Sequence, residues 1–261
     1  MISQTRERPL TIWLTGATSG IGLALLEALV ARGDYVIATG RNRDRLEELR
    51  HQHGEQVIPL AGDVTSVPDC QHFSDQLSTL APVDWAVLNA GTCEYMDVQN
   101  FDAELVSRVV NANIVGTARS VEAALPALRA SGSGQGRPLL AIVSSSAWWF
   151  PFTRAEAYGA SKAATTYFAE SLRADLAEED IDVSVVSPGF VRTPLTDQND
   201  FSMPFLMEAD DAARIMVRDL TRHRRDIHFP KRFTWPLKLI GCLPRTIRDR
   251  MAAAMARGQR D

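Results

Sequence analysis

The stretch Thr15-Gly16-Ala17-Thr18-Ser19-Gly20-Ile21-Gly22 decides the fold of this 261-residue chain. A short apolar run at residues 10–14 leads into it, and residues 21–32 follow with the spacing of an amphipathic helix. Glycine lets the backbone approach a ligand closely, and the start of a helix offers free N–H groups and a positive dipole end. A strand, a glycine-rich turn and a helix in this order favour a pyrophosphate site over a purely structural turn. The predicted contacts are Gly16, Thr18, Ser19, Gly20, Ile21 and Gly22.

Short apolar runs alternate with amphipathic stretches along the rest of the chain. Further strands are expected at residues 35–38, 57–60, 85–88, 139–143 and 183–186, and a second helix at 43–51. Together with the glycine turn, this alternation predicts an α/β fold rather than an eight-fold barrel: a doubly wound parallel sheet of the Rossmann type with helices on both faces. We expect residues 1–261 to form a single domain, with a Gly- and Ser-rich surface loop at 131–137.

Composition narrows the class of ligand. The formal net charge is -4, which gives no overall attraction to a nucleic-acid backbone, so a small molecule is the expected partner. Cys70, Cys93 and Cys242 lie far apart, which argues against disulfides and against a metal site and favours a reducing, cytoplasmic compartment. Residues 1–9 carry charges of both signs, and no run of apolar residues is long enough for a membrane span, so neither a secretory signal nor a spanning helix is expected.

The end of the second expected strand bears on the type of dinucleotide. Many NAD-binding units place an acidic residue there for the ribose hydroxyls, but this chain reads Ala38-Thr39-Gly40-Arg41-Asn42-Arg43. An arginine fork can grip a 2′-phosphate, so Arg41 and Asn42 predict NADP(H) in preference to NAD(H). The alternative is that Arg41 and Arg43 are solvated loop charges. Asp63 and Val64, after the third strand, are candidates to contact the adenine, although Asp63 could equally cap the next helix.

Tyr158 and Lys162 form the candidate catalytic pair. They stand four residues apart in a helical pattern, so they share one face of the helix. A free tyrosine titrates near pH ~10, and a positive charge beside it favours the phenolate. A Tyr-x-x-x-Lys pattern on its own is common enough to arise by chance.

Taken together, the motifs resemble the short-chain dehydrogenase/reductase family in order and spacing, over roughly residues 10 to 195. The matching positions are the glycine turn, Leu88-Asn89-Ala90-Gly91, Asn113, Ser145, Tyr158 with Lys162, and Pro188-Gly189. The resemblance implies further cofactor contacts beyond the glycine turn. These are Asn89, Ala90, Gly91, Tyr158, Lys162, Pro188, Gly189, Val191 and Thr193, with Thr193 reaching the nicotinamide carboxamide.

The same resemblance implies catalytic roles. Tyr158 would give its proton to a carbonyl oxygen as hydride arrives from the nicotinamide, or take it back in oxidation. Ser145 would hydrogen-bond that oxygen; Ser144 and Ser146 are alternatives, and the thirteen-residue spacing to Tyr158 favours Ser145.

Two further residues complete the implied catalytic set. Lys162 would lower the tyrosine pKa and hold the nicotinamide ribose. Asn113 would anchor a water that returns the proton, although it could instead satisfy backbone groups inside a helix.

Apolar residues near these motifs suggest the kind of substrate. A variable lid is expected at residues 194–210, rich in Phe and Met, although the same residues could pack on the following helix. Trp148, Trp149, Phe150 and Phe152 favour an apolar substrate or a subunit contact. Cys93 and Glu94 follow the Asn-Ala-Gly turn and are expected on an exposed loop, although both could face the cleft. The expected function is NADPH-dependent reduction of a moderately hydrophobic ketone or aldehyde. A dinucleotide sensor without turnover, or a hydride-returning epimerase, are the alternatives.

The carboxyl-terminal part is strongly basic. Residues 218–261 hold twelve Lys or Arg against four Asp, a net charge of +8, while residues 1–217 carry -12. Aromatic residues interleave with the bases from residue 228 on, so we treat 228–261 as a basic, aromatic extension. It could lie on an anionic membrane surface, and we prefer packing over the cleft or across a dimer interface. A homodimer is therefore expected rather than the tetramer of the best-known family members.

Overall fold

The computed structural model describes residues 8–80, 82–131, 136–197 and 199–258. Within them, one seven-stranded parallel sheet runs in the order β3-β2-β1-β4-β5-β6-β7. The strands are β1 (Thr11–Thr15), β2 (Tyr35–Gly40), β3 (Val57–Ala61), β4 (Trp85–Leu88), β5 (Leu139–Val143), β6 (Asp182–Pro188) and β7 (Asp226–Phe229). The predicted doubly wound α/β fold is confirmed.

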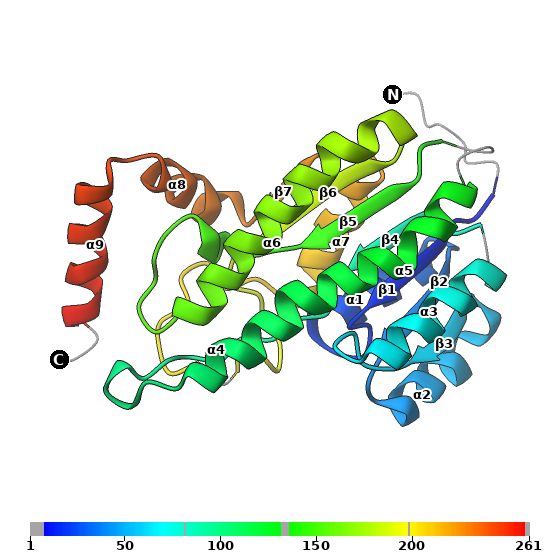
Figure 1. Ribbon diagram of the computed structural model, residues 1–261, viewed down its shortest axis with the longest axis horizontal. Helices are drawn as coiled ribbons and strands as arrows, with labels where there is room; N and C mark the ends of the chain where they lie inside the picture. The colour runs from blue at the N-terminus through cyan, green and yellow to red at the C-terminus, as the bar shows by residue number, and fades with distance from the viewer. Residues whose placement is uncertain (1–7, 81, 132–135, 198, 259–261) are drawn as a thin grey trace.

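Helices cover both faces of this sheet. The helices are α1 (Gly20–Ala31), α2 (Arg43–His53), α3 (Val67–Leu80), α4 (Ala103–Val110), α5 (Gly116–Ser131), α6 (Glu156–Asp175), α7 (Ala209–Leu220), α8 (Lys231–Gly241) and α9 (Arg245–Gly258). One core cluster joins the sheet to α1, α2 and α7, and a second joins it to α3, α5 and α6, which cross in front of the sheet in Figure 1. The two clusters explain why the central strands are uniformly apolar: both of their faces are buried.

The order of the strands places the site. The chain runs outward from β1 to β3 and then returns to pair β4 against the other side of β1. The connections that follow β1 and β4 therefore leave the sheet in opposite directions. Open α/β sheets bind ligands in the crevice that this creates at the carboxyl ends of the two strands. Thr15 ends β1 and Leu88 ends β4, so the glycine turn and the Asn89-Ala90-Gly91 turn emerge side by side.

The carboxyl-terminal region differs from the sequence-based expectation. β7 pairs in parallel with β6, and Ile227 and Phe229 belong to the main core cluster. The expected boundary of the extension, residue 228, thus falls inside a strand. The segment outside the sheet consists of α8 and α9, called here the C-terminal arm, which extends from the end of the sheet where its strands have their carboxyl ends (Figure 1). Most of the expected loop at 131–137 lies outside the described residues.

None of the described helices combines the length and the hydropathy needed to cross a bilayer.

Candidate active site

A cleft of about 740 Å³ opens at the carboxyl ends of the strands and gathers most of the residues singled out from the sequence. Those that line it are Gly16, Thr18, Ser19, Gly20, Ile21, Arg41, Asp63, Val64, Asn89, Ala90, Gly91, Ser145, Tyr158, Lys162, Pro188, Gly189, Val191 and Thr193. Sequence positions as far apart as Gly16 and Thr193 meet here because every contributing segment follows the carboxyl end of a strand or a nearby helix.

Three predicted site residues do not line the cleft, and each has a structural role. A Cβ on Gly22 would lie 2.0 Å from the Gly16 carbonyl oxygen, so glycine is needed for α1 to pack against the turn. The Asn42 side chain accepts a hydrogen bond from the Arg45 N–H at 3.0 Å and caps α2. Asn113 is fully buried beneath the cleft.

The glycine turn has the geometry of an anion cradle. Gly16 and Gly20 both have positive φ, 67° and 53°, which residues with a side chain rarely adopt. Asn89 ties the turn to β4, since its Nδ2 donates to the carbonyls of Thr15 at 3.3 Å and Gly16 at 3.2 Å. The first N–H groups of α1 therefore face the cleft from a fixed position. These residues fit the pyrophosphate of a dinucleotide.

Arg41 is the cationic side chain that lines the cleft at the end of β2, whereas Arg43 begins α2 and does not line it. A Cβ on Gly40 would lie 2.7 Å from Thr18 Cγ2, so the end of β2 packs directly on the glycine turn. Arg41 consequently stands beside the anion cradle, where a 2′-phosphate would be reached.

Asp63 lines the cleft and organises the turn that follows β3. Its Oδ1 accepts from the N–H and the hydroxyl of Thr65, both at 2.8 Å. The Ser66 hydroxyl, not Asp63, accepts from the Asp69 N–H in the first turn of α3. The geometry therefore favours a cleft residue over a helix cap for Asp63.

Tyr158 and Lys162 lie on the same face of α6, with the lysine Nζ 5.9 Å from the centre of the tyrosine ring. Lys162 is buried, and its Nζ donates to the carbonyl of Val143, at the end of β5, at 2.9 Å. Burial lowers the pKa of Lys162 to about 8 because the charged amine loses its hydration. Helix α6 and strand β5 thus hold the amine beneath the tyrosine.

The environment of Tyr158 keeps its hydroxyl protonated. Burial raises the pKa of the phenol above its usual value, the neighbouring Cys93 adds to the increase, and a hydrogen bond with Ser145 opposes it. A phenol with a raised pKa is a proton donor at neutral pH, before any positive charge arrives beside it.

The three candidate serines are distinguished by their partners. Ser144 Oγ donates to the carbonyl of Lys162 at 2.9 Å and also contacts Thr166 Oγ1 at 2.7 Å, so it braces α6. Ser146 is buried and does not line the cleft. Ser145 lines the cleft and is the serine of the three that hydrogen-bonds with Tyr158. The geometry favours Ser145 as the substrate-facing hydroxyl.

Asn113 lies in a π-helical turn, Asn111–Val115, between α4 and α5. Its Oδ1 accepts from the Thr92 N–H at 2.8 Å, while its Nδ2 donates to the Thr92 carbonyl and to Ser161 Oγ, both at 2.9 Å. Ser161 Oγ in turn donates to the carbonyl of Tyr158 at 2.7 Å. Asn113 therefore couples the turn after β4 to the helix that carries Tyr158, and π-helical turns of this kind are common at functional sites.

The expectation that Cys93 and Glu94 lie on an exposed loop is wrong. Both are partly buried; Glu94 lines the cleft and binds Arg108 of α4, with Oε2 and Nη2 2.8 Å apart. Cys93 lies close enough to Tyr158 and Lys162 to act on both electrostatically, and burial raises the pKa of its thiol to about 11. The alternative, that these residues face the cleft because they directly follow the Asn89-Ala90-Gly91 turn, describes Glu94 correctly.

An aromatic cluster missed from the sequence lies next to Tyr158. Tyr95 packs edge-on against Phe201 with ring centres 5.4 Å apart, and Phe201 lies 6.1 Å from Phe190. Tyr158 acts electrostatically on Tyr95, so this cluster adjoins the reacting hydroxyl. Phe201 comes from the expected lid, and it packs on the loop after β4 rather than on the following helix.

The aromatic run after Ser145 has a different role from the expected one. Trp149 and Phe150 are buried within the chain, where they pack on Leu237 of α8. Neither lines the cleft, because α8 folds over them. These residues therefore join the catalytic loop to the C-terminal arm and carry no argument about the substrate.

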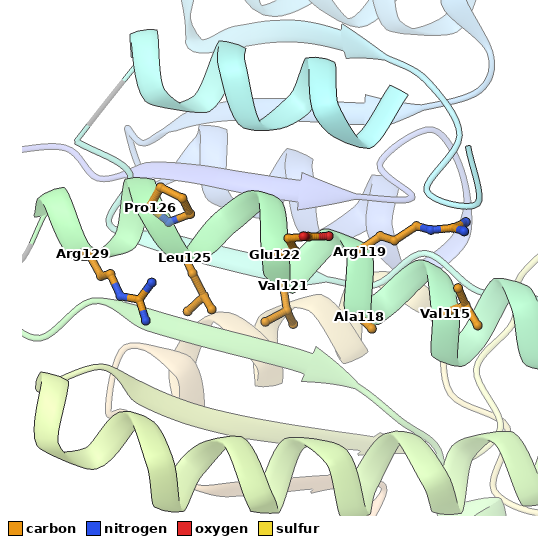
Figure 2. A pocket seen from close by; sticks show the side chains of 8 residues that line it. All are labelled: Val115, Ala118, Arg119, Val121, Glu122, Leu125, Pro126 and Arg129. Carbon is orange, nitrogen blue, oxygen red and sulfur yellow. The ribbon is translucent and has the colours of Figure 1, made fainter. Parts of the chain in front are cut away.

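A second hollow, of about 500 Å³, lies on the outer side of α5, away from the motif residues. Figure 2 shows its lining side chains, all from the helical segment between Val115 and Arg129. It is an open groove on one helix and lacks the converging polar groups of the cleft. Among the described residues, no cluster of His, Cys, Asp and Glu could hold a metal ion.

Comparison with known proteins establishes the family. The model of the short chain dehydrogenase family matches residues 10–202, and the chain belongs to that family of oxidoreductases. An "uncharacterized oxidoreductase" of Myxococcus xanthus is 34% identical over 246 residues, covering 93% of this chain and 96% of the relative. A "probable NADP-dependent dehydrogenase" of Haemophilus influenzae is 37% identical over 184 residues, 69% of this chain and 70% of the relative.

Solved structures agree on the fold. A short chain dehydrogenase from Burkholderia cenocepacia in complex with NADP superposes with a TM-score of 0.81 at 23% identity, covering 94% of this chain and 98% of that one. A short-chain dehydrogenase from Sphingobium yanoikuyae in complex with NADPH gives 0.75 at 24% identity, covering 90% and 97%. At these identities the likeness speaks for the fold alone.

Proposed function

We propose that this protein is an NADPH-dependent reductase that converts a moderately hydrophobic ketone or aldehyde to the alcohol. The observation that carries the proposal is that Tyr158 and Ser145 line the same cleft as an anion cradle and Arg41, with burial raising the pKa of the Tyr158 phenol. That combination offers a proton donor, an oxyanion partner and a dinucleotide site within one cavity.

The residues divide the chemistry as follows. NADPH, when bound, supplies the hydride to the carbonyl carbon. The Ser145 hydroxyl donates a hydrogen bond to the carbonyl oxygen and so orients it and disperses the developing negative charge. The Tyr158 hydroxyl gives that oxygen its proton, which leaves a phenolate above the Lys162 amine. Protonation of Lys162, whose pKa of about 8 lies near working pH, would stabilise this phenolate and allow the proton to be replaced.

The proposed preference for NADP(H) over NAD(H) is based on the residues at the end of β2. The residues there are Thr39, Gly40 and Arg41, with no carboxylate for ribose hydroxyls and a guanidinium that suits a phosphate. The relative from Haemophilus influenzae, a probable NADP-dependent dehydrogenase, supports the same choice.

The preference for an apolar substrate rests on Val191, Pro194 and Leu195, whose apolar side chains line the cleft. The aromatic cluster of Tyr95, Phe190 and Phe201 packs together outside this lining. Apolar groups around a few convergent polar atoms suit a hydrophobic carbonyl compound.

Two wider expectations remain proposals. The three cysteines are free, in keeping with a reducing, cytoplasmic compartment. We also keep the homodimer as the expected assembly.

The test is the oxidation of NADPH and of NADH by purified protein against a panel of ketones and aldehydes. Tyr158→Phe should lower kcat by about 1,000-fold while NADPH still binds, because the ring remains and only the transferable proton is lost. Tyr167→Phe is the matched control, since Tyr167 is on the same helix but 75% exposed. Tight NADPH binding without turnover on any carbonyl would favour the sensor. Substrate inversion without net NADPH consumption would favour the epimerase.

A further inference from the structure

The C-terminal arm has one face packed on the body and one face left open. Phe233, Leu237 and Ile240 of α8 pack on the loop that carries Trp149 and Phe150, and Ala252 of α9 joins the same cluster. None of the described residues of the arm lines the cleft, so the arm lies beside the cleft rather than over it.

The open face carries exposed apolar residues on α8, in the turn after it and on α9, together called here the stripe. Its members recur at every fourth position and are each between 36% and 65% exposed: Trp235, Leu239, Leu243, Ile247 and Met251. Residues four apart are neighbours on a helix surface, so Trp235 with Leu239, and Ile247 with Met251, form adjoining apolar patches on α8 and α9. Single exposed apolar residues are ordinary, but a row of five on one segment marks a contact surface.

Basic residues border this stripe on both helices. On α8, Lys231 and Arg232 precede Trp235 by four and three residues. On α9, Arg250 follows Ile247 by three residues and Arg248 precedes Met251 by three, so each of these bases is a helical neighbour of the stripe.

Most of this charge is uncompensated. Lys238 pairs with Asp226, but Arg232, Arg245 and Arg250 form no ion pair with any residue that the structure describes. The carboxylate of the arm's own sequence, Asp249, stands two residues from Ile247 and Met251 and so faces away from the stripe.

The charge of the whole chain is divided in the same direction. The arm itself, residues 231–258, holds seven Lys or Arg against one Asp, a net charge of +6, and the rest of the chain carries -10. An anionic surface would attract the arm and repel the body, which fixes a single orientation. The arm extends from the carboxyl end of the sheet, where the cleft opens, and Phe233 at its base lies 5.3 Å from Phe190 of the aromatic cluster (Figure 1).

We infer that the C-terminal arm binds the surface of an anionic lipid bilayer, with the stripe in the interface and the flanking bases at the phosphates. Helices of mixed apolar and basic character lie on a membrane in this way, and aromatic residues such as Trp235 favour the interface. A second copy of the chain fits less well, because a two-fold contact through the arm would place its bases against the same bases of the partner. The inference does not depend on the proposed function.

Vesicle co-sedimentation of the full chain tests this. Vesicles of equal parts phosphatidylcholine and phosphatidylglycerol should pellet the protein at low salt, and vesicles of phosphatidylcholine alone should not. Leu239→Ser with Ile247→Ser should weaken binding at least about ten-fold through lost apolar contact. Arg232→Gln with Arg250→Gln should weaken it about twenty-five-fold, or about five-fold for each charge removed. Added salt should weaken binding of the wild type.

Matched variants outside the arm serve as controls. Val67→Ser with Tyr167→Ser removes exposed apolar side chains from α3 and α6, and Arg50→Gln removes an exposed base from α2. These should bind vesicles as the wild type does, and all variants should retain the far-ultraviolet circular dichroism of the native fold. Equal binding to neutral vesicles, or equal losses in the controls, overturns the inference. Absence of vesicle binding overturns it too, and a dimer that dissociates on Leu239→Ser with Ile247→Ser would then identify the stripe as a contact between copies.

Discussion

Around the glycine turn, side chains and backbone are fastened to one another, whereas the C-terminal arm presents its side chains outward. Thr15 Oγ1 accepts from the N–H groups of Asn89 at 3.0 Å and Ala90 at 3.1 Å, which locks two turns of the cleft together. In the arm, Leu239 and Ile247 meet solvent instead. The two regions differ in how their side chains are used. Residues around the glycine turn are held in place by hydrogen bonds within the chain, and residues on the open face of the arm remain exposed.

The largest difference between the two regions should appear in stability. Leu25, on α1 beneath the turn, is fully buried, and Leu25→Ala should lower the free energy of unfolding by about 3 kcal/mol through lost contacts and a cavity. Leu239→Ala, on the arm, should change it by less than about 0.5 kcal/mol. Urea unfolding measures both. Equal losses would break the comparison and make the arm part of the core.

The affinity for NADPH should distinguish two arginines beside the glycine turn, one that lines the cleft and one that does not. Arg41→Ala should weaken NADPH binding by about 10- to 100-fold, the value of a charge-assisted hydrogen bond to phosphate, and leave NADH binding unchanged. Arg43→Ala removes the same charge two residues away, outside the cleft lining, and should have little effect. Isothermal titration with both nucleotides decides the matter. A matching loss in Arg43→Ala would return both arginines to the role of solvated loop charges.

The buried amine of Lys162 should make the free energy of unfolding depend on pH above neutrality. Its pKa is about 8 in the fold and about 10.4 in an unfolded chain, so between these values the unfolded chain binds more protons. Stability therefore rises as the pH rises through this interval. Relative to Lys162→Met, the wild type should gain about 2 kcal/mol of unfolding free energy between pH 8 and pH 10. Urea unfolding at both pH values measures the gain, and parallel behaviour of the two proteins would place the amine in solvent.

The contacts of His228, at the base of the arm, should make the stability of the fold depend on pH below neutrality. The Thr234 hydroxyl donates to the Pro230 carbonyl, so it accepts from His228 Nδ1 at 2.7 Å, which leaves Nε2 unprotonated near Trp149 and Trp235. Burial lowers the pKa of His228 to about 4.

The unfolded chain consequently binds the proton first as the pH falls below ~6.5, and stability is lost. Relative to His228→Gln, the wild type should lose about 2 kcal/mol between pH 7 and pH 5. Tryptophan fluorescence during urea unfolding reports this. A loss of the same size in His228→Gln would assign it to other groups.

The order of the elements and the shared helix face of Tyr158 and Lys162 could be predicted from sequence because both depend on local spacing. The alternation of residues 10–14 and 21–32 requires a strand and a helix, and four residues between Tyr158 and Lys162 require a common helical face. The fold and the family were confirmed on this basis.

The burial of several residues could not be predicted, because it depends on which distant segment of the chain packs over them. Trp149 and Phe150 have the composition of a substrate wall, and only the position of α8 shows that they are covered. The position of Cys93 and Glu94 after the Asn89-Ala90-Gly91 turn left exposure and the cleft as alternatives, and the packing of α4 against Glu94 decides between them for that residue. β7 was missed because its four residues stand within a basic, aromatic segment that lacks the apolar run of the other strands.

The π-helical turn at Asn111–Val115 bears on how this sequence can vary between related proteins. Removing one residue there would restore an unbroken α-helix but rotate α4 by about 100° relative to α5. That rotation would carry the Asn113 amide away from Thr92 and Ser161. Exchanges at the outward positions of the same helices leave the alignment intact. Between residues 103 and 131, descendants of this chain should therefore diverge at the outward positions of α4 and α5 and keep the length of the π-helical turn.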